Sequence, residues 1–199
     1  MRRLVAVEYV SVDGVIQAPG HDGEDPEGGF RHGGWTGPFM DQHRRYLTDL
    51  YWGAGAFLLE RTTYEIFAAY WPTVTDEGDR IAAALNGRPK YVASTSMQEA
   101  HWPRTTVIHG DVAGKVAELK EQSGGDILLI GSSRLAQTLI APGLVDQYQL
   151  WLHPVVLGSG KRLFGPTRID VTLADARTIG NGLVILTYEP MGRSGRREP

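Results

Sequence analysis

The chain has 199 residues, of which 42% are hydrophobic, and its 25 glycines and 11 prolines fall short of a low-complexity composition. This predicts one packed domain. The 20 lysines and arginines against 23 acidic residues give a formal charge of −3, which offers no basic surface for nucleic acid or an anionic membrane. The absence of cysteine excludes disulfide scaffolds, thiolate zinc sites and cysteine nucleophiles.

The N-terminal apolar run is interrupted by Glu8 and is too short for a signal peptide. No apolar run reaches the roughly 18 residues of a transmembrane helix. We therefore expect a cytoplasmic protein with no membrane partner. Residues 1–190 are predicted to form a single domain, and the polar, basic residues 191–199 a disordered tail.

The first half of the chain alternates strands, loops and helices. The Val-rich segment 4–10 predicts a buried strand, and the Gly-, Pro- and acid-rich segment 17–38 predicts either a binding loop or lid, or a mobile surface insertion. Residues 39–52 have the apolar spacing of an amphipathic helix. A short buried strand at 56–59 and a helix from Arg61 to the Trp71-Pro72 step follow.

The second half continues the alternation before its pattern changes. We expect helices at 76–85, 111–122 and within 132–140, the last with Ser132 or Ser133 as its N-cap, and strands at 90–94, 107–108 and 127–130. This alternation favours a largely parallel sheet. From Val145 the apolar runs lengthen and are separated by Gly-rich turns, which predicts strands joined as hairpins or nearly so, and an antiparallel C-terminal edge.

Three predicted strands end in residues suited to binding an anion. Gly131-Ser132-Ser133-Arg134, Arg61-Thr62-Thr63 and Ser94-Thr95-Ser96 each follow a strand, and the first two open a helix. Each segment alone also fits an ordinary capped turn. Because ligands of open α/β sheets bind beyond the carboxyl ends of the strands, the three together predict a phosphorylated cofactor.

The common nucleotide, metal and hydrolase motifs are absent. The sequence has no G-x-G-x-x-G after the first strand, no P-loop, no H-E-x-x-H and no G-x-S-x-G. A standard Rossmann domain, a kinase fold and a serine hydrolase are therefore disfavoured, and no metal site is predicted.

Five segments in order resemble one known family. They are VSVDGVIQAPG, LLERTTYEIFAAYWP, KYVAS, ILLIGSSRLAQTLI and QLWLHPVVLGSGKRLF. Together they are similar to the dihydrofolate reductase-like fold, and in particular to the C-terminal reductase domain of the bifunctional riboflavin-biosynthesis deaminase/reductase. The resemblance spans residues 2 to 189. It implies a mixed, mainly parallel α/β sheet flanked by helices, an NADPH-dependent reductase, and a homodimer.

The resemblance also implies site residues. The substrate would be a small heterocycle, pyrimidine- or pterin-like, or a phosphoribosyl-type molecule, and the activity would resemble that of 5-amino-6-(5-phosphoribosylamino)uracil reductase. Asp13 is the candidate catalytic residue, assisting proton delivery, although an Asp in a turn also has a purely structural use. Gln17 is a candidate substrate contact. The side chains of the Gly-rich loop, rather than the resemblance, suggest two more: Trp35 would stack on a flat ring, and His32 would either donate a proton or face solvent. The cofactor would contact Ile16, Arg61, Thr62, Thr63, Ser94, Thr95, Gly131, Ser132, Ser133, Arg134 and Leu135.

Two positions depart from the pattern of the resembled reductases. Glu60 stands where the cofactor loop usually has glycine, and Ile130 stands where the pyrimidine reductases usually have glutamate. These departures keep open a second hypothesis, a non-catalytic protein that binds a nucleotide or small ligand. A third hypothesis, a purely structural dimeric module, predicts no nucleotide affinity.

Overall fold

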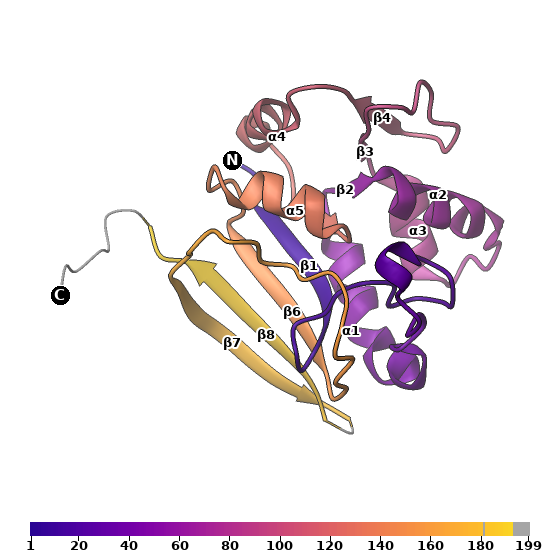
Figure 1. The fold of residues 1–199 in the computed structure, drawn as a ribbon. Coiled ribbons are helices and arrows are strands. Elements are labelled where there is room, and N and C mark those ends of the chain that lie inside the picture. The colour runs from indigo at the N-terminus through magenta and orange to yellow at the C-terminus, as the bar shows by residue number, and fades with distance from the viewer. Residues whose placement is uncertain (181, 193–199) are drawn as a thin grey trace.

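The computed structural model describes residues 1–180 and 182–192 and consists of one eight-stranded sheet with helices on both faces (Figure 1). The strands are β1 Leu4–Ser11, β2 Ala56–Glu60, β3 Lys90–Ala93, β4 Thr105–Ile108, β5 Ile127–Ile130, β6 Gln147–His153, β7 Val171–Ile179 and β8 Leu183–Pro190. The α-helices are α1 Met40–Gly53, α2 Arg61–Tyr70, α3 Arg80–Gly87, α4 Val112–Glu121 and α5 Ser133–Ile140. Three short 3-10 turns cover Glu27–Gly29, Gly37–Phe39 and Trp71–Thr73.

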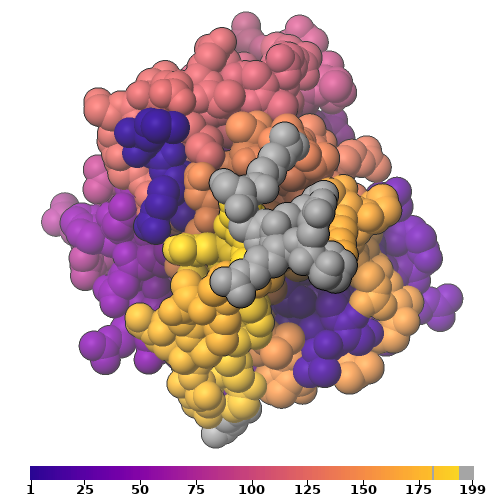
Figure 2. Space-filling model, turned by 90° about the vertical axis from the view of Figure 1, so that its left-hand side faces the viewer, coloured from indigo at the N-terminus to yellow at the C-terminus, as the bar shows by residue number. Residues whose placement is uncertain are grey.

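The sheet has the strand order β4-β3-β2-β5-β1-β6-β8-β7. The first six strands in this order run parallel to one another, whereas β8 pairs antiparallel with both β6 and β7. The predicted mixed α/β sheet with an antiparallel C-terminal edge is confirmed. The last two strands lie at the surface (Figure 2), and β7 is the edge strand.

Both faces of the central strands are buried, which explains why β1 reads as an almost continuous apolar run. Leu4 and Ala6 belong to the core under α4 and α5, whereas Val5 and Val7 belong to the core under α1, α2 and α3. In Figure 1, α5 accordingly crosses in front of β1 while α1 lies behind the sheet.

The structure corrects one predicted helix boundary and one expected strand pairing. The helix expected from residue 76 begins at Arg80, because the Asp79 carboxylate accepts hydrogen bonds from the amides of Ile81 and Ala82 and caps the helix there. The last apolar runs also pair differently from a simple succession of hairpins. β7 and β8 do form a hairpin, but β8 lies between β6 and β7 in the sheet, so residues 154–170 connect β6 to the edge strand β7 past β8.

The expected disordered tail lies mostly outside the described residues. Of the tail 191–199, only Met191 and Gly192 belong to the described residues, and the amide of Met191 donates to the carbonyl of Asp170. The homodimer stays a prediction. Within residues 1–180 and 182–192, no helix has the length and apolar character needed to cross a bilayer.

Candidate functional site

A cavity of about 1130 Å³ opens where the parallel strands end. Strands β4, β3, β2 and β5 stop at Ile108, Ala93, Glu60 and Ile130, and the loop that follows each of them lines the cavity. β1 pairs with β5 as far as Val7 and then continues alongside β6. The cavity therefore lies at the crevice that parallel topology creates at strand ends, as the sequence predicted.

One end of the cavity carries hydroxyls and a guanidinium group. Arg61, Thr62 and Thr63 form the first turn of α2 and line the cavity, as do Ser94, Thr95 and Ser96 after β3. The Arg61 Nη1 donates to Ser96 Oγ at 3.3 Å, and its Nε lies 3.8 Å from the Glu65 carboxylate. Half of the Arg61 side chain is exposed, so the guanidinium has free faces toward an anion.

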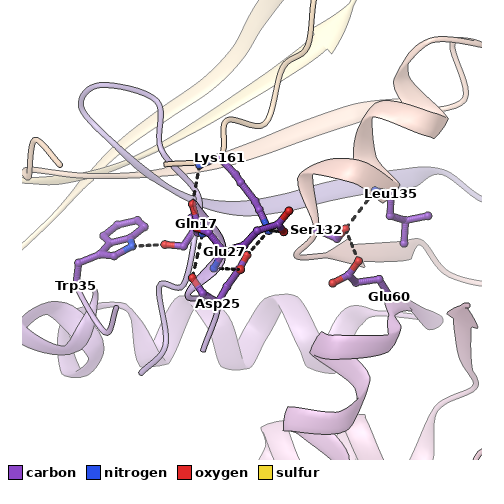
Figure 3. Close-up of polar contacts among 8 residues, drawn as sticks. All are labelled: Gln17, Asp25, Glu27, Trp35, Glu60, Ser132, Leu135 and Lys161. Atoms are coloured by element: carbon purple, nitrogen blue, oxygen red, sulfur yellow. Dashed lines mark hydrogen bonds and ion pairs between the residues drawn. The ribbon is translucent and has the colours of Figure 1, made fainter. Parts of the chain in front are cut away.

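The turn before α5 is the most constrained part of the site. Gly131 has φ +71° and Ser132 has φ +64°, a left-handed conformation that costs a non-glycine residue of the order of 1 kcal/mol or more. The Ser132 hydroxyl stabilises it twice: it accepts from the amide of Leu135 at 3.2 Å and donates to Glu60 Oε2 at 2.7 Å (Figure 3). Glu60, which departs from the resembled pattern, thus holds the facing loop in place.

The first turn of α2 and the turn after β5 are in close contact. A Cβ atom at Gly131 would lie 2.8 Å from Thr63 Oγ1, closer than real Cβ atoms come. The first turns of α2 and α5, with Ser133, Arg134 and Leu135, therefore face one cavity. Two converging helix N-termini and two arginines make this end attractive to an anion.

The other end of the cavity is lined by the acidic loop after β1. Gln17 is buried, and its amide donates to the carbonyls of Asp25 and Glu27 and accepts from the amide of Lys161. The Lys161 ammonium lies 2.6 Å from each of the Asp25 and Glu27 carboxylates (Figure 3). Gln17 and Ile16 line the cavity as predicted, but the amide of Gln17 is already committed to the loop.

The predicted catalytic role of Asp13 is corrected by the structure, because Asp13 does not line the cavity. Its carboxylate accepts from Ser11 Oγ and from the amides of Leu157 and Gly158, and these bonds lower its pKa to about 2. An acid ionised this strongly has no proton to donate near neutral pH. The turn-forming use, weighed as the alternative, is the one that the geometry supports.

His32 and Trp35 also lie outside the cavity lining. His32 is exposed and meets the ring of Phe30 edge to face at 5.5 Å. Trp35 is buried, and its indole N–H donates to the carbonyl of Gln17 at 2.8 Å while its ring packs against His153. Trp35 therefore anchors the loop to the domain, and its ring is not available to stack on a ligand.

Sequence reasoning missed Glu8. This residue lies on β1 just beyond the last pair with β5, is only 4% exposed, and lines the cavity. Within the described part of the chain, no hydrogen bond or ion pair reaches its carboxyl group. Burial raises its pKa to about 8. The signal in the sequence is a single acid inside an otherwise apolar strand. From the sequence, this acid serves only as an argument against a signal peptide.

Comparison with known proteins identifies the family. The RibD C-terminal domain family matches residues 2–185. The chain belongs to this family. It is 30% identical over 197 residues to the uncharacterized protein YyaP of Bacillus subtilis, with 94% of each chain covered.

Solved structures share the fold at low sequence identity. A pyrimidine reductase-like protein from Corynebacterium diphtheriae superposes with a TM-score of 0.67 at 15% identity, covering 96% of this chain and 92% of that one. Dihydrofolate reductase from Enterococcus faecalis, solved with NADP(H), gives a TM-score of 0.59 at 14% identity, covering 94% and 96%. The chain therefore has the fold on which these reductases are built.

Proposed function

We propose that this protein is an NADPH-dependent reductase that transfers hydride to a small pyrimidine- or pterin-like heterocycle. The observation that carries the proposal is the single cavity that joins the cationic, hydroxyl-rich end at α2 and α5 to the buried carboxyl of Glu8. A dinucleotide needs the first end, and a reduction that adds a proton as well as hydride needs an acid.

The residues of the cationic end fit a dinucleotide phosphate. The first turns of α2 and α5 would hold the pyrophosphate. Gly131 packs tightly against Thr63 and has no side chain, so nothing at this position shields the backbone amides of the turn from a phosphate. Arg61, beside Ser96, would hold the 2′-phosphate of the adenosine. The Glu60 carboxylate keeps its negative charge when it accepts the Ser132 hydroxyl, and the two cations of this end, Arg61 and Arg134, outnumber it.

The chain's own residues would supply the proton and limit the access of water. When bound, the reduced nicotinamide supplies a hydride and is oxidised. Glu8, protonated near neutral pH, would give its proton to the ring nitrogen of the C=N bond that accepts the hydride, and would regain a proton from water. The loop held by Gln17 and Lys161 covers this end of the cavity and would limit the access of water.

The test is a titration with NADPH and with NADH, which lacks the 2′-phosphate, followed by the fluorescence of Trp71 in the cavity wall. Arg61→Ala should weaken NADPH binding by about 10- to 100-fold, as expected for a charge-assisted contact, and leave NADH binding unchanged. Arg168→Ala, whose side chain is 87% exposed and outside the lining, is the matched control.

Absence of binding of either nucleotide would overturn the proposal and leave the structural module. Binding of NADPH without its oxidation by any pterin, flavin precursor or pyrimidine would favour the non-catalytic nucleotide-binding protein.

A further inference from the structure

The two ends of the cavity differ in charge. The end at α2 and α5 carries Arg61 and Arg134 against the one carboxylate of Glu60, which is bonded to Ser132. The end lined by the loop after β1 carries three carboxylates, those of Glu24, Asp25 and Glu27, against the one ammonium of Lys161.

The only ammonium at the loop end of the described lining is already neutralised. Lys161 lies 2.6 Å from both Asp25 and Glu27, so a phosphate that approached it would have to displace two carboxylates. The third carboxylate, of Glu24, accepts from the backbone amides of Gly20 and His21 and stays at the cavity wall. An anionic substrate group therefore meets net negative charge at this end.

Glu8 adds an unsatisfied acceptor to the same cavity. Its residue is 4% exposed, and its Oε1 is buried without a partner among the described residues. The nearby titratable groups Tyr9 and Tyr51 supply no positive charge to it, because a tyrosine is either neutral or anionic and burial raises the pKa of both hydroxyls, which keeps them neutral. A buried carboxyl left in this way is costly unless a ligand supplies N–H groups.

We propose that the substrate end of the cavity selects a flat nitrogen heterocycle without a phosphate group, neutral or cationic, whose amidine-type N–H groups pair with the Glu8 carboxyl. The inference rests on the proposed function and narrows its substrate class. A ring that carries a phosphoribosyl group is selected against, whereas an aminated or protonated ring satisfies Glu8 and complements the acidic loop.

The test uses benzamidine, a flat cationic amidine, in the absence of any nucleotide, and measures its binding by ligand-observed NMR and calorimetry. Benzamidine should bind the wild-type protein, and Glu8→Gln should weaken it about tenfold or more, since a charge-assisted pair is lost. Glu121→Gln, at an exposed site on α4 outside the lining, should leave binding unchanged. At pH 7, binding should release about one proton from the wild type and none from Glu8→Gln.

Competition separates the two ends of the cavity. Benzoate, the anionic counterpart of the probe, and uridine 5′-phosphate should fail to displace benzamidine, even where they bind at the cationic end. The double variant Asp25→Asn, Glu27→Gln should weaken benzamidine binding and let benzoate compete. This variant tests the acidic loop independently of Glu8.

Three results would overturn the inference: no binding of benzamidine, equal affinity in Glu8→Gln, or displacement by either anion at equal or lower concentration. Failure of the proposed function looks different. A protein that binds benzamidine through Glu8 but no nucleotide would refute the reductase alone, and one that binds NADPH but prefers the anions would refute the substrate class alone.

Discussion

Burial of an unpaired carboxyl at Glu8 should make the protein less stable as the pH rises. Burial raises the folded-state pKa from 4.5 to about 8, so this group favours folding fully below pH 4.5 and progressively less as the pH rises to 8. Each pH unit between the two pKa values lowers the free energy of unfolding by about 1.4 kcal/mol. From pH 4.5 to pH 7 the loss therefore amounts to about 3 kcal/mol. Glu8→Gln keeps the shape of the side chain and removes the ionisation.

We expect Glu8→Gln to be more stable than the wild type at pH 7 to 8, with a flatter dependence of the free energy of unfolding on pH between 4.5 and 8. Urea denaturation at a series of pH values measures both quantities. Glu121→Gln, at an exposed position, should follow the wild-type curve. Equal pH slopes in Glu8→Gln and the wild type would refute the reasoning, because they would mean that Glu8 is not buried and unpaired. A gain in stability on removal of this acid is the behaviour expected of a residue retained for function.

Further variants probe the rest of the site. His43 is fully buried, and neither ring nitrogen has a hydrogen-bond partner among the residues that the structure describes. Burial, together with the charge of His153, lowers its pKa to about 4. The neutral ring is compatible with the folded state above pH 6.5, and the free energy of unfolding falls by about 3 kcal/mol as the pH drops from 6.5 toward 4. His43→Phe should therefore resist acid unfolding, which circular dichroism measures. Gly131→Ala should destabilise the fold by more than Gly143→Ala and should abolish NADPH binding, because both have positive φ but only Gly131 would clash with the facing loop. Equal Tm losses in the two would contradict this. Lys161→Ala should cost about 1 kcal/mol and speed trypsin cleavage in the loop after β1; an unchanged cleavage rate would show that its two ion pairs do not hold the loop.

Much of the scaffold follows from local sequence. The apolar run at 127–130 and the serines after it predicted β5, its turn and the start of α5, because strand composition and capping act within a few residues. The meeting of the loops after β2, β3 and β5 was also predictable, since the carboxyl ends of parallel strands share one edge. The ten cofactor positions predicted at these three strand ends all line one cavity.

What the side chains do there depends on partners distant in sequence. Asp13 is held by amides at 157 and 158, and Trp35 turns inward onto Gln17 and His153, so neither assignment could be judged from its neighbours in the chain. Glu60 departs from the resembled pattern, and its hydrogen-bond donor, Ser132, lies 72 positions further on, so its structural role could not be judged from its neighbours in the chain either. The sequence by itself determined the elements and the edge of the sheet where the cavity lies, because these depend on local propensity and strand direction. The tertiary structure decided the chemistry, because burial and long-range contacts are what separate the neutral Glu8 from the ionised Asp13.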